Sequence, residues 1–573
     1  MNRKPLIARP LPAVHSLPER LHPVLKRVYL GRGVLSVEDL DYSLSRLPSP
    51  FLLPGMAAMT ERLGNAVREQ KRILVVADYD ADGATACAVA VKGLRALGAQ
   101  QVDFVVPDRF RLGYGLTPGL VEAVLSRRPQ VLLTVDNGIS SLPGVQTAKS
   151  AGMEVLVTDH HLPGEKLPEA DAIVNPNLSG SIFPSTALAG VGVMFYVLCA
   201  LRAELRKEGW FSRRGIAEPK LKELLDLVAL GTVADVVPLD GLNRILVYHG
   251  LKQIRRAPCP GIQALLEVAG CCREEVVAAD LGFALGPRLN AAGRLEDMTL
   301  GIRCLLSENL EEARVLARRL DSLNRERQRI EAKMQAEAAA YLDSITDGSR
   351  VPCLFAPSWH EGVVGILAAR LRDRLKVPAI AFALGRDGLL KGSARSIPGL
   401  HIRDLLAEID ASHPGLIARY GGHAMAAGLS LQPENYPRFS ALFAERLAAY
   451  LARLSAEEAI YTDGYLNSVD FSSSLATELR FAGPWGQGFP EPLFHGEFEV
   501  QSAALVKDRH LRLSVRPAQG PWLKAVAFNL DDKAKDFSPL DCHELRLAYR
   551  LDLDQFQGSR AVQLTVEYLE PVR

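Results

Sequence analysis

Three aspartates spaced two residues apart follow an apolar run in "ILVVADYDADGATACAVA" (73–90). In an extended segment, Asp78, Asp80 and Asp82 would share one face, with about 7 Å between sequence neighbours. Like charges this close repel one another unless a positive charge lies among them. The stretch therefore predicts that a bound cation balances the three carboxylates.

Further aspartates and histidines also follow or lie within apolar segments of the chain. Asp136 ends the apolar run "VLLTVD", "TDHH" (158–161) follows another run, and Asp235 lies in "ALGTVADVVPL". Oxygen donors with a histidine suit Mn²⁺ or Mg²⁺ better than a metal that seeks thiolates. One ion cannot easily be shared by so many ligands, whereas two ions roughly 3.5 to 4 Å apart can share them through a bridging carboxylate. The candidate metal ligands are Asp78, Asp80, Asp82, Asp136, Asp235 and the histidines of "TDHH".

The elements that would position these side chains are buried parallel strands. Val/Ile/Leu runs recur at intervals of roughly 20 to 30 residues, which is typical of strands joined by crossover helices. The expected strands are 73–77, 102–107, 131–136, 154–159 and 172–176. Open α/β sheets bind ligands in the crevice outside the carboxyl ends of their strands. We therefore expect a doubly wound α/β domain with the aspartates and "TDHH" at one edge.

Composition limits the class of protein. A chain of 573 residues is long enough for three or four domains, and its net charge of +1 confines any nucleic-acid site to a local basic patch. The eight cysteines include no C-x-x-C pair, which favours reduced thiols in a cytosol. Without a secretory leader or an apolar run of 18 residues, we expect a soluble, cytoplasmic protein with no membrane partner.

The middle of the chain predicts a phosphate-binding loop and a long helix. "ALGPRLNAAGR" (284–294) offers Arg288, Asn290 and Arg294 on a loop bounded by glycines, a grouping that could hold phosphate oxygens. From 302 to 347 there is no glycine or proline. Asn309 and Glu312 predict a helix start of capping-box type. We expect a strut between domains, whose arginines form a solvated face or a track for a polyanion.

Two further units are expected after the strut. Between about 350 and 450, three expected glycine-rich loops flank arginine or histidine and could present N–H groups and a cation to an anion. These are "SWHEGVVGILAARL" (358–371), "KGSARSIPGLHIRDLL" (391–406) and "YGGHAMAAGLS" (420–430). From about 457, period-two alternation in "HLRLSVR", "LKAVAFNL", "ELRLAYRLDLD" and "AVQLTVEYL" predicts a small β-barrel or sandwich.

Taken in order, these motifs resemble the DHH phosphoesterases, and among them the RecJ family of bacterial exonucleases that degrade single-stranded DNA from 5′ to 3′. The resemblance runs from about residue 50 to the C-terminus and includes the intact triplet Asp159, His160 and His161. It implies five segments: an N-terminal extension (1–50), a DHH catalytic domain (51–300), a connecting helix (301–347), a DHH-associated α/β domain (348–456) and an OB-like nucleic-acid-binding domain (457–573).

The resemblance also implies roles for the metal ligands. Asp80 and Asp82 would each bind one metal ion, Asp136 would bridge the two, and His160 and Asp235 would complete the second site. Many smaller members place a histidine four residues before the first paired aspartate. This chain has Val76 there, so Asp78 is the expected substitute ligand at the first site.

The remaining predicted site residues surround the substrate. His161 resembles the histidine beside the scissile phosphate, where it would stabilise charge or protonate the leaving oxygen, and Asp159 would orient the histidine pair. Contacts to substrate are expected from one further set: Arg288, Asn290, Arg294, His360, Ser393, Arg395 and His423.

The implied activity is hydrolysis of single-stranded DNA to 5′-mononucleotides with two Mn²⁺ or Mg²⁺ ions, in DNA repair and recombination. The implied state is a monomer, with a single-strand-binding protein and a helicase as partners by family analogy. One alternative is a DHH phosphodiesterase acting on small nucleotides or short oligonucleotides, although such a substrate requires neither the strut nor a β domain. Another is an inactive single-strand-binding scaffold, although a scaffold need not keep the clustered ligands.

Overall fold

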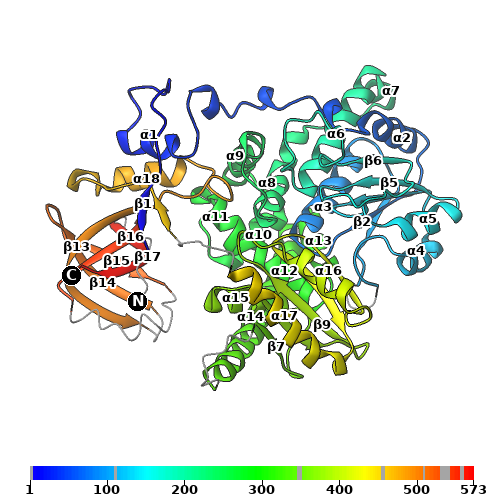
Figure 1. Ribbon diagram of the computed structural model, residues 1–573. Helices are drawn as coiled ribbons and strands as arrows, with labels where there is room; N and C mark the ends of the chain where they lie inside the picture. The colour runs from blue at the N-terminus through cyan, green and yellow to red at the C-terminus, as the bar shows by residue number, and fades with distance from the viewer. Residues whose placement is uncertain are drawn as a thin grey trace.

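The structure is a computed structural model that describes residues 4–108, 112–344, 352–452, 459–506, 510–528, 542–554 and 561–572. Two α/β units lie side by side, and a β-barrel stands apart from the first sheet (Figure 1). The boundaries expected at 347/348 and 456/457 fall outside the described residues. In the described part of the chain, no helix combines the length and the apolar character needed to cross a membrane.

The first sheet has five parallel strands in the order β3-β2-β4-β5-β6. They are β2 (Ile73–Ala77), β3 (Val102–Val105), β4 (Val131–Val135), β5 (Glu154–Thr158) and β6 (Ala172–Val174). Each expected strand is confirmed, because continuous apolar runs can be buried on both faces only under crossover helices. From β2 the chain goes first to β3 on one side and then to β4 on the other. A ligand crevice is therefore expected between the carboxyl ends of β2 and β4.

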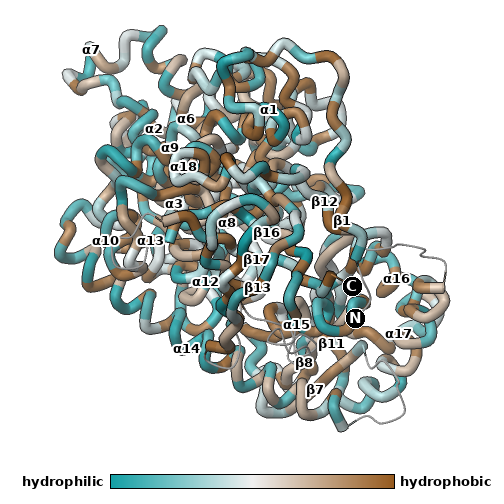
Figure 2. The backbone as a smooth tube through the Cα atoms, turned by 90° about the vertical axis from the view of Figure 1, so that its left-hand side faces the viewer, coloured by the Kyte–Doolittle hydropathy of each residue, from teal (hydrophilic) through white to brown (hydrophobic). Residues whose placement is uncertain are grey.

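Helices with small residues pack beside this crevice. They are α3 (Ala81–Ala96), α6 (Gly190–Lys207) and α8 (Leu225–Ala234), which contact one another. A Cβ on Gly93 of α3 would lie 2.2 Å from a methyl carbon of Leu198 in α6, and one on Gly231 of α8 would lie 2.2 Å from Thr85 Oγ1 in α3. The small residues thus let the three helices approach closely. Outer helices such as α10 (Pro260–Ala269) instead carry both apolar and polar residues (Figure 2).

The expected long helix is confirmed as α14 (Leu310–Asp343), which begins after Asn309, and a separate short helix, α13 (Thr299–Leu306), precedes it. Asn309 caps α14 by accepting hydrogen bonds from the N–H groups of Glu311 and Glu312. A capping box also requires the Glu312 carboxylate to accept the N–H of Asn309. That part of the prediction was wrong, because the carboxylate accepts instead from Ser307 Oγ at 2.8 Å. Ser307 is therefore the residue that joins the two helices.

Helix α14 spans both α/β units, as a strut should, but it is not free between them. Ala317 and Leu320 near its start belong to the core of the first unit, while Met334 and Ala338 belong to a core cluster of the second. Several of its arginines are ion-paired, among them Arg327 with Glu331 at 2.7 Å. Paired arginines contribute less to a polyanion track than the sequence alone suggested.

The second unit has a mixed five-stranded sheet in the order β10-β11-β9-β8-β7. Its strands are β7 (Cys353–Phe355), β8 (Ala379–Leu384), β9 (Leu390–Arg395), β10 (Arg419–Gly422) and β11 (Ala426–Leu431). Helices α15 (Val364–Leu375), α16 (Ile402–Ser412) and α17 (Tyr436–Leu451) flank it. Two of the three expected glycine-rich loops were wrong in part, because "KGSAR" is strand β9 and "YGG" and "AAGLS" are strands of a hairpin. Glycines at 392, 421 and 428 lie within these strands.

The C-terminal strands close into a barrel in the order β13-β14-β15-β17-β16. The strands are β13 (Phe494–Val506), β14 (His510–Pro517), β15 (Leu523–Ala527), β16 (Glu544–Leu553) and β17 (Val562–Pro571). The four expected from the sequence are confirmed. Strand β13 was missed because it directly follows a Gly/Pro-rich stretch that reads as a turn.

The N-terminal segment is joined to the C-terminal region. Strand β1 (Leu6–Ala8) pairs in parallel with β12 (Ile460–Thr462), and Arg32 forms a buried ion pair with Asp463 at 2.7 Å. Helix α1 (Pro23–Leu30) lies beside α18 (Ser473–Phe481), next to the barrel (Figure 1). The extension expected at 1–50 is therefore packed against the opposite end of the chain.

Candidate metal centre and active site

The first three aspartates occupy the turn from β2 into α3. Asp80 is the N-cap of α3, and its Oδ1 accepts the N–H of Gly83 at 2.9 Å. Asp82 lies in the first turn, where its two oxygens accept the N–H groups of Gly190 and Val191 at 2.6 and 2.9 Å. The shared extended face expected for the three was wrong, because the helix begins at Ala81. Two helix N-termini instead meet at this cluster, and their partial positive charge favours carboxylates there.

Asp136 follows β4 in an unusual backbone conformation. Its φ of 61° is left-handed, which Asp adopts more readily than most residues. A Cβ on Gly190 would lie 2.6 Å from the Asp136 side chain, so glycine is needed there for α6 to approach. Such strain costs about 1–3 kcal/mol and is concentrated at functional sites. The fold thus holds the Asp136 carboxylate at a fixed place over the crevice.

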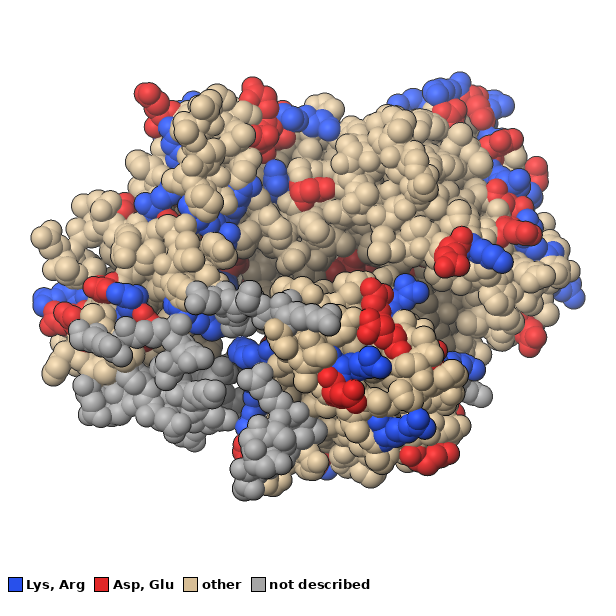
Figure 3. Space-filling model, in the orientation of Figure 1, with Lys and Arg blue, Asp and Glu red and all other residues tan. Residues whose placement is uncertain are grey.

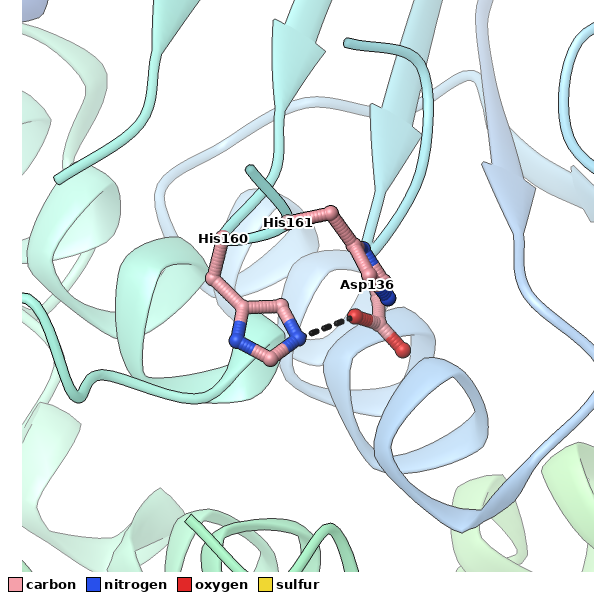
Figure 4. Close-up of side chains that lie close together, drawn as sticks. All are labelled: Asp136, His160 and His161. Atoms are coloured by element: carbon pink, nitrogen blue, oxygen red, sulfur yellow. Dashed lines mark ion pairs between the residues drawn. The ribbon is translucent and has the colours of Figure 1, made fainter. Parts of the chain in front are cut away.

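His160 lies among carboxylates from the first turn of α3 and from the ends of β4 and α8. Its Nε2 lies 3.1 Å from Asp136 Oδ1, 3.5 Å from Asp235 Oδ2 and 4.0 Å from Asp82 Oδ2. Figure 4 shows the ring directed at the Asp136 carboxylate. Ligand atoms within 4.8 Å of one another form three overlapping groups. These are Asp78 with Asp80 and Asp136, Asp82 with His160 and Asp235, and Asp136 with His160 and His161.

The chemistry of this donor set fits divalent cations. Asp136 Oδ1 and His160 Nε2 are buried and make no hydrogen bond in the described structure. Burial and the neighbouring aspartates raise the pKa of Asp136 and of Asp235, and burial together with Asp80 raises the pKa of Asp82 to about 7. Burial lowers the pKa of His160 to about 4, so its ring is neutral and can donate a lone pair. Acidic groups that repel one another and a neutral imidazole would bind a cation of high charge.

Asp159 and His161 form a separate pair beside this cluster. Asp159 Oδ1 lies 2.7 Å from His161 Nδ1, and Asp159 Oδ2 accepts the N–H of Ile139. Burial raises the pKa of Asp159, but the hydrogen bond and charge of His161 outweigh it and leave the pKa below its ordinary value. Burial lowers the pKa of His161, but Asp159 outweighs it and raises the pKa to about 9. His161 is therefore a cation at neutral pH and can donate a proton.

The second unit brings His423 to the same place. The rings of His423 and His161 are stacked with centroids 6.2 Å apart. On β9, Arg395 Nη1 donates to Ser393 Oγ at 2.9 Å, and burial, with Arg372 nearby, lowers the Arg395 pKa. The surface is hollowed between the two α/β units, with acidic residues in its depth (Figure 3). This hollow has the position expected for a substrate.

Four of the predicted substrate residues hold the fold together in the described structure. The loop expected at 284–294 was wrong, because Gly286–Leu295 is helix α12, preceded by a π-helical turn. Arg288 pairs with Asp321 of α14 at 2.9 Å, and Asn290 Oδ1 accepts the N–H of Ala81 at 2.8 Å.

Arg294 and His360 meet at one turn of the second unit. Arg294 donates to the carbonyl of Gly362, and His360 Nδ1 accepts the Gly362 N–H at 3.0 Å. A Cβ on Gly362 would lie 2.2 Å from the Arg294 carbonyl oxygen, so glycine is required where the two units touch. Contact of Arg288, Asn290, Arg294 and His360 with substrate stays a prediction.

Tyr114 is a site residue that sequence reasoning missed. Its hydroxyl lies 3.4 Å from His161 Nδ1 and donates to the Asp136 carbonyl at 3.3 Å. Its ring meets Tyr79 and His161 edge-on, each with centroids 6.0 Å apart. The signal available in the sequence was an aromatic between two glycines in "GYG", after the second expected strand.

Comparison with known proteins agrees with this geometry. Three family models match the chain: "DHH family, N-terminal domain" at 72–232, "DHHA1 domain" at 348–449 and "RecJ OB domain" at 462–568. The single-stranded-DNA-specific exonuclease RecJ of Dickeya dadantii is 50% identical over 563 residues, 97% of each chain. The chain belongs to the RecJ family.

Solved RecJ structures share the whole architecture. RecJ of Thermus thermophilus in complex with Mn²⁺ matches with a TM-score of 0.80 and 30% identity, covering 100% of this chain and 80% of that one. The Mg²⁺ complex of the same RecJ matches with a TM-score of 0.73 and 29% identity, covering 98% and 78%. The DHH fold, the DHHA1 domain and an OB-type barrel expected from the sequence are thereby confirmed.

Proposed function

We propose that this protein is a metal-dependent exonuclease specific for single-stranded DNA, which degrades it from 5′ to 3′ and releases 5′-mononucleotides in DNA repair and recombination. The observation that carries the proposal is Asp136, shared by two ligand groups at the switch point of a full-length RecJ-family fold. Neither an inactive scaffold nor a structural protein requires buried donor atoms that lack hydrogen bonds.

Residues of the three overlapping ligand groups would hold two Mn²⁺ or Mg²⁺ ions. Asp78, Asp80 and Asp136 would bind one, while Asp82, His160 and Asp235 would bind the other with Asp136 as the bridge. When bound, such ions activate water and neutralise charge on a phosphodiester during in-line displacement. Asp78 belongs to the first ligand group. This supports its proposed role as the substitute for the histidine that many smaller DHH proteins carry where this chain has Val76.

His161 is the proposed proton donor to the leaving 3′ oxygen. Asp159 bonds its Nδ1, which leaves Nε2 for the substrate. The positive charge of the imidazolium would also stabilise the phosphorane-like transition state. His423, stacked on His161, and the Ser393–Arg395 pair on β9 would hold the non-bridging oxygens from the second unit.

The barrel is proposed to hold the strand away from the metal centre. OB-type barrels bind single strands through basic grooves and exposed aromatic rings. Trp522 is partly exposed directly before β15, with the Arg516 guanidinium 4.7 Å from its ring centroid. A monomer working in the cytoplasm with a single-strand-binding protein and a helicase is proposed from family analogy alone.

The test is digestion of one single strand carrying the label at either end, with Mn²⁺ present. The 5′-labelled strand should release labelled mononucleotide at once, while the 3′-labelled strand should shorten stepwise and release label last. Cleavage confined to dinucleotides would support the small-nucleotide phosphodiesterase, and tight binding without release would support the scaffold. Initial release from the 3′ end would overturn the proposed polarity.

A further inference from the structure

Side chains hold the backbone N–H and C=O groups of His160 and His161. Both N–H groups donate to Asp159 Oδ1, at 2.7 and 3.0 Å. The carbonyl of His161 accepts from Asn175 Nδ2 at 2.9 Å, and the carbonyl of His160 accepts from Asn177 Nδ2 at 2.6 Å. The dipeptide lies beyond the end of β5, outside any helix or strand, so no regular hydrogen-bond ladder fixes it.

The two asparagines are placed by the neighbouring strand. Asn175 directly follows β6, whose Val174 carbonyl accepts the N–H of Asp159 at 3.1 Å. Asn175 is fully buried, and its Oδ1 accepts the N–H of Asn177 at 2.7 Å. Pro176 between them restricts the backbone further. The sequence "VNPN" therefore forms a rigid clamp against the end of β5.

The direction of each imidazole follows from this clamp. The Nε2 of His160 faces the carboxylates and lies 3.1 Å from Asp136 Oδ1. In that position the Nε2 lone pair is available to a metal ion. His161 points the other way, toward Asp159 and Tyr114. The adjacent residues His160 and His161 thus direct their rings to two different places, the carboxylate cluster and the Asp159–Tyr114 side. A fixed backbone between them is needed for both directions to be kept.

We propose that Asn175 and Asn177 are positioning residues for the hydrolysis proposed above, on which this inference rests. Asn177 acts through His160 and sets the metal ligand, while Asn175 acts through His161 and sets the proton donor. Active-site groups need to be held within about 0.5 Å of their productive positions, and supporting hydrogen bonds supply that accuracy. Each amide therefore affects a different property of the enzyme.

The test uses Asn177→Asp and Asn175→Asp in the full-length protein. Aspartate keeps the shape of asparagine but replaces the NH₂ donor with an oxygen that faces a carbonyl. Mn²⁺ binding is measured directly by the electron paramagnetic resonance of free Mn²⁺, and cleavage by single-turnover kinetics at saturating Mn²⁺. Asn177→Asp should weaken Mn²⁺ binding by roughly 10- to 100-fold, the usual cost of losing a group that orients a metal ligand.

Asn175→Asp should give the converse result. Mn²⁺ binding should stay at the wild-type level, while the cleavage rate at saturating Mn²⁺ should fall by roughly 10- to 100-fold. Asn435→Asp is the matched control, because the Asn435 amide also donates to backbone carbonyls, those of Gly415 and Leu416, away from the metal centre. It should change the melting temperature alone.

If Asn177→Asp does not fold, the Mn²⁺-binding measurement is repeated with Asn177→Ala. This variant removes the NH₂ donor without adding a repelling oxygen. The inference is overturned if the variants at 175 and 177 bind Mn²⁺ and cleave like wild type, or if both lose metal binding and rate to the same degree. Wild-type protein that binds Mn²⁺ but does not degrade single strands would instead refute the proposed function. In that case Mn²⁺ binding by Asn177→Asp still tests the clamp.

Discussion

His160 Nε2 lies 3.1 Å from Asp136 Oδ1, and neither atom has a hydrogen-bond partner in the described structure. An unsatisfied buried polar atom costs about 1–3 kcal/mol. Without a metal, a proton on Asp136 offsets part of that cost, in keeping with the raised pKa of its carboxyl. A metal ion between the two atoms would remove it.

Replacing Asp136 tests the shared ligand. Asn is the better substitution than Ala, because the φ of 61° is one that Asn tolerates. Asp136→Asn should lower single-strand cleavage on the order of 10³-fold, comparable with losing a main electrostatic stabiliser, and should not lower the metal-free melting temperature. Rate measurements over a Mn²⁺ series and thermal unfolding check this. Near-wild-type cleavage in excess Mn²⁺ would contradict the shared-ligand assignment.

Replacing His161 separates proton donation from metal binding. His161→Ala should leave Mn²⁺ binding nearly intact and lower the chemical rate by about 10² to 10⁴, the usual contribution of a proton donor. Single-turnover cleavage and Mn²⁺ titration give the two quantities. His413→Ala, at a partly exposed histidine of the second unit, is the control. A parallel loss of metal affinity would make His161 a ligand, as its place in the third ligand group allows.

Replacing Trp522 tests the barrel as a DNA contact. If a base stacks on this ring, Trp522→Ala should weaken binding of a long single strand by about 1–3 kcal/mol, while cleavage of a trinucleotide stays unchanged. Deleting the whole C-terminal region is a poorer test, because β12 pairs with β1 and Asp463 pairs with Arg32. Tyr341→Ala, at another exposed aromatic, serves as the control. Equal losses on both substrates would assign Trp522 a structural role.

The C-terminal region should lose stability in mild acid through His495. Burial lowers the pKa of His495, whose Nδ1 lies 2.7 Å from Thr462 Oγ1. The folded state thus binds fewer protons than the unfolded state, where the pKa is about 6.5. The contribution is present above that pH and is lost as pH falls from about 6.5 through the folded pKa. His495→Gln should show a smaller drop in melting temperature between pH 7.5 and 5.5, as calorimetry can measure; an unchanged drop would refute this.

Much of the fold could be predicted because buried segments have recognisable patterns of apolar residues in the sequence. The runs at 73–77 and 131–135 became β2 and β4, since strands covered on both faces must be apolar throughout. The alternating C-terminal strands likewise became a barrel. Strand β13 and helix α12 were missed, because glycine, proline and polar residues there gave turn signals that tertiary packing overrode.

For the metal centre, the sequence by itself indicated the candidate carboxylate ligands, because carboxylates at the ends of buried strands have few other reasons to be there. It could not determine which of them meet. Asp235 and His160 are 75 positions apart, yet α8 and β5 bring their ligand atoms within 3.5 Å of each other. The same packing drew Arg288 to Asp321 and placed Asn175 and Asn177 against the two histidines. The sequence shows the composition of each segment directly, whereas the partner of a polar side chain depends on which distant elements pack beside it.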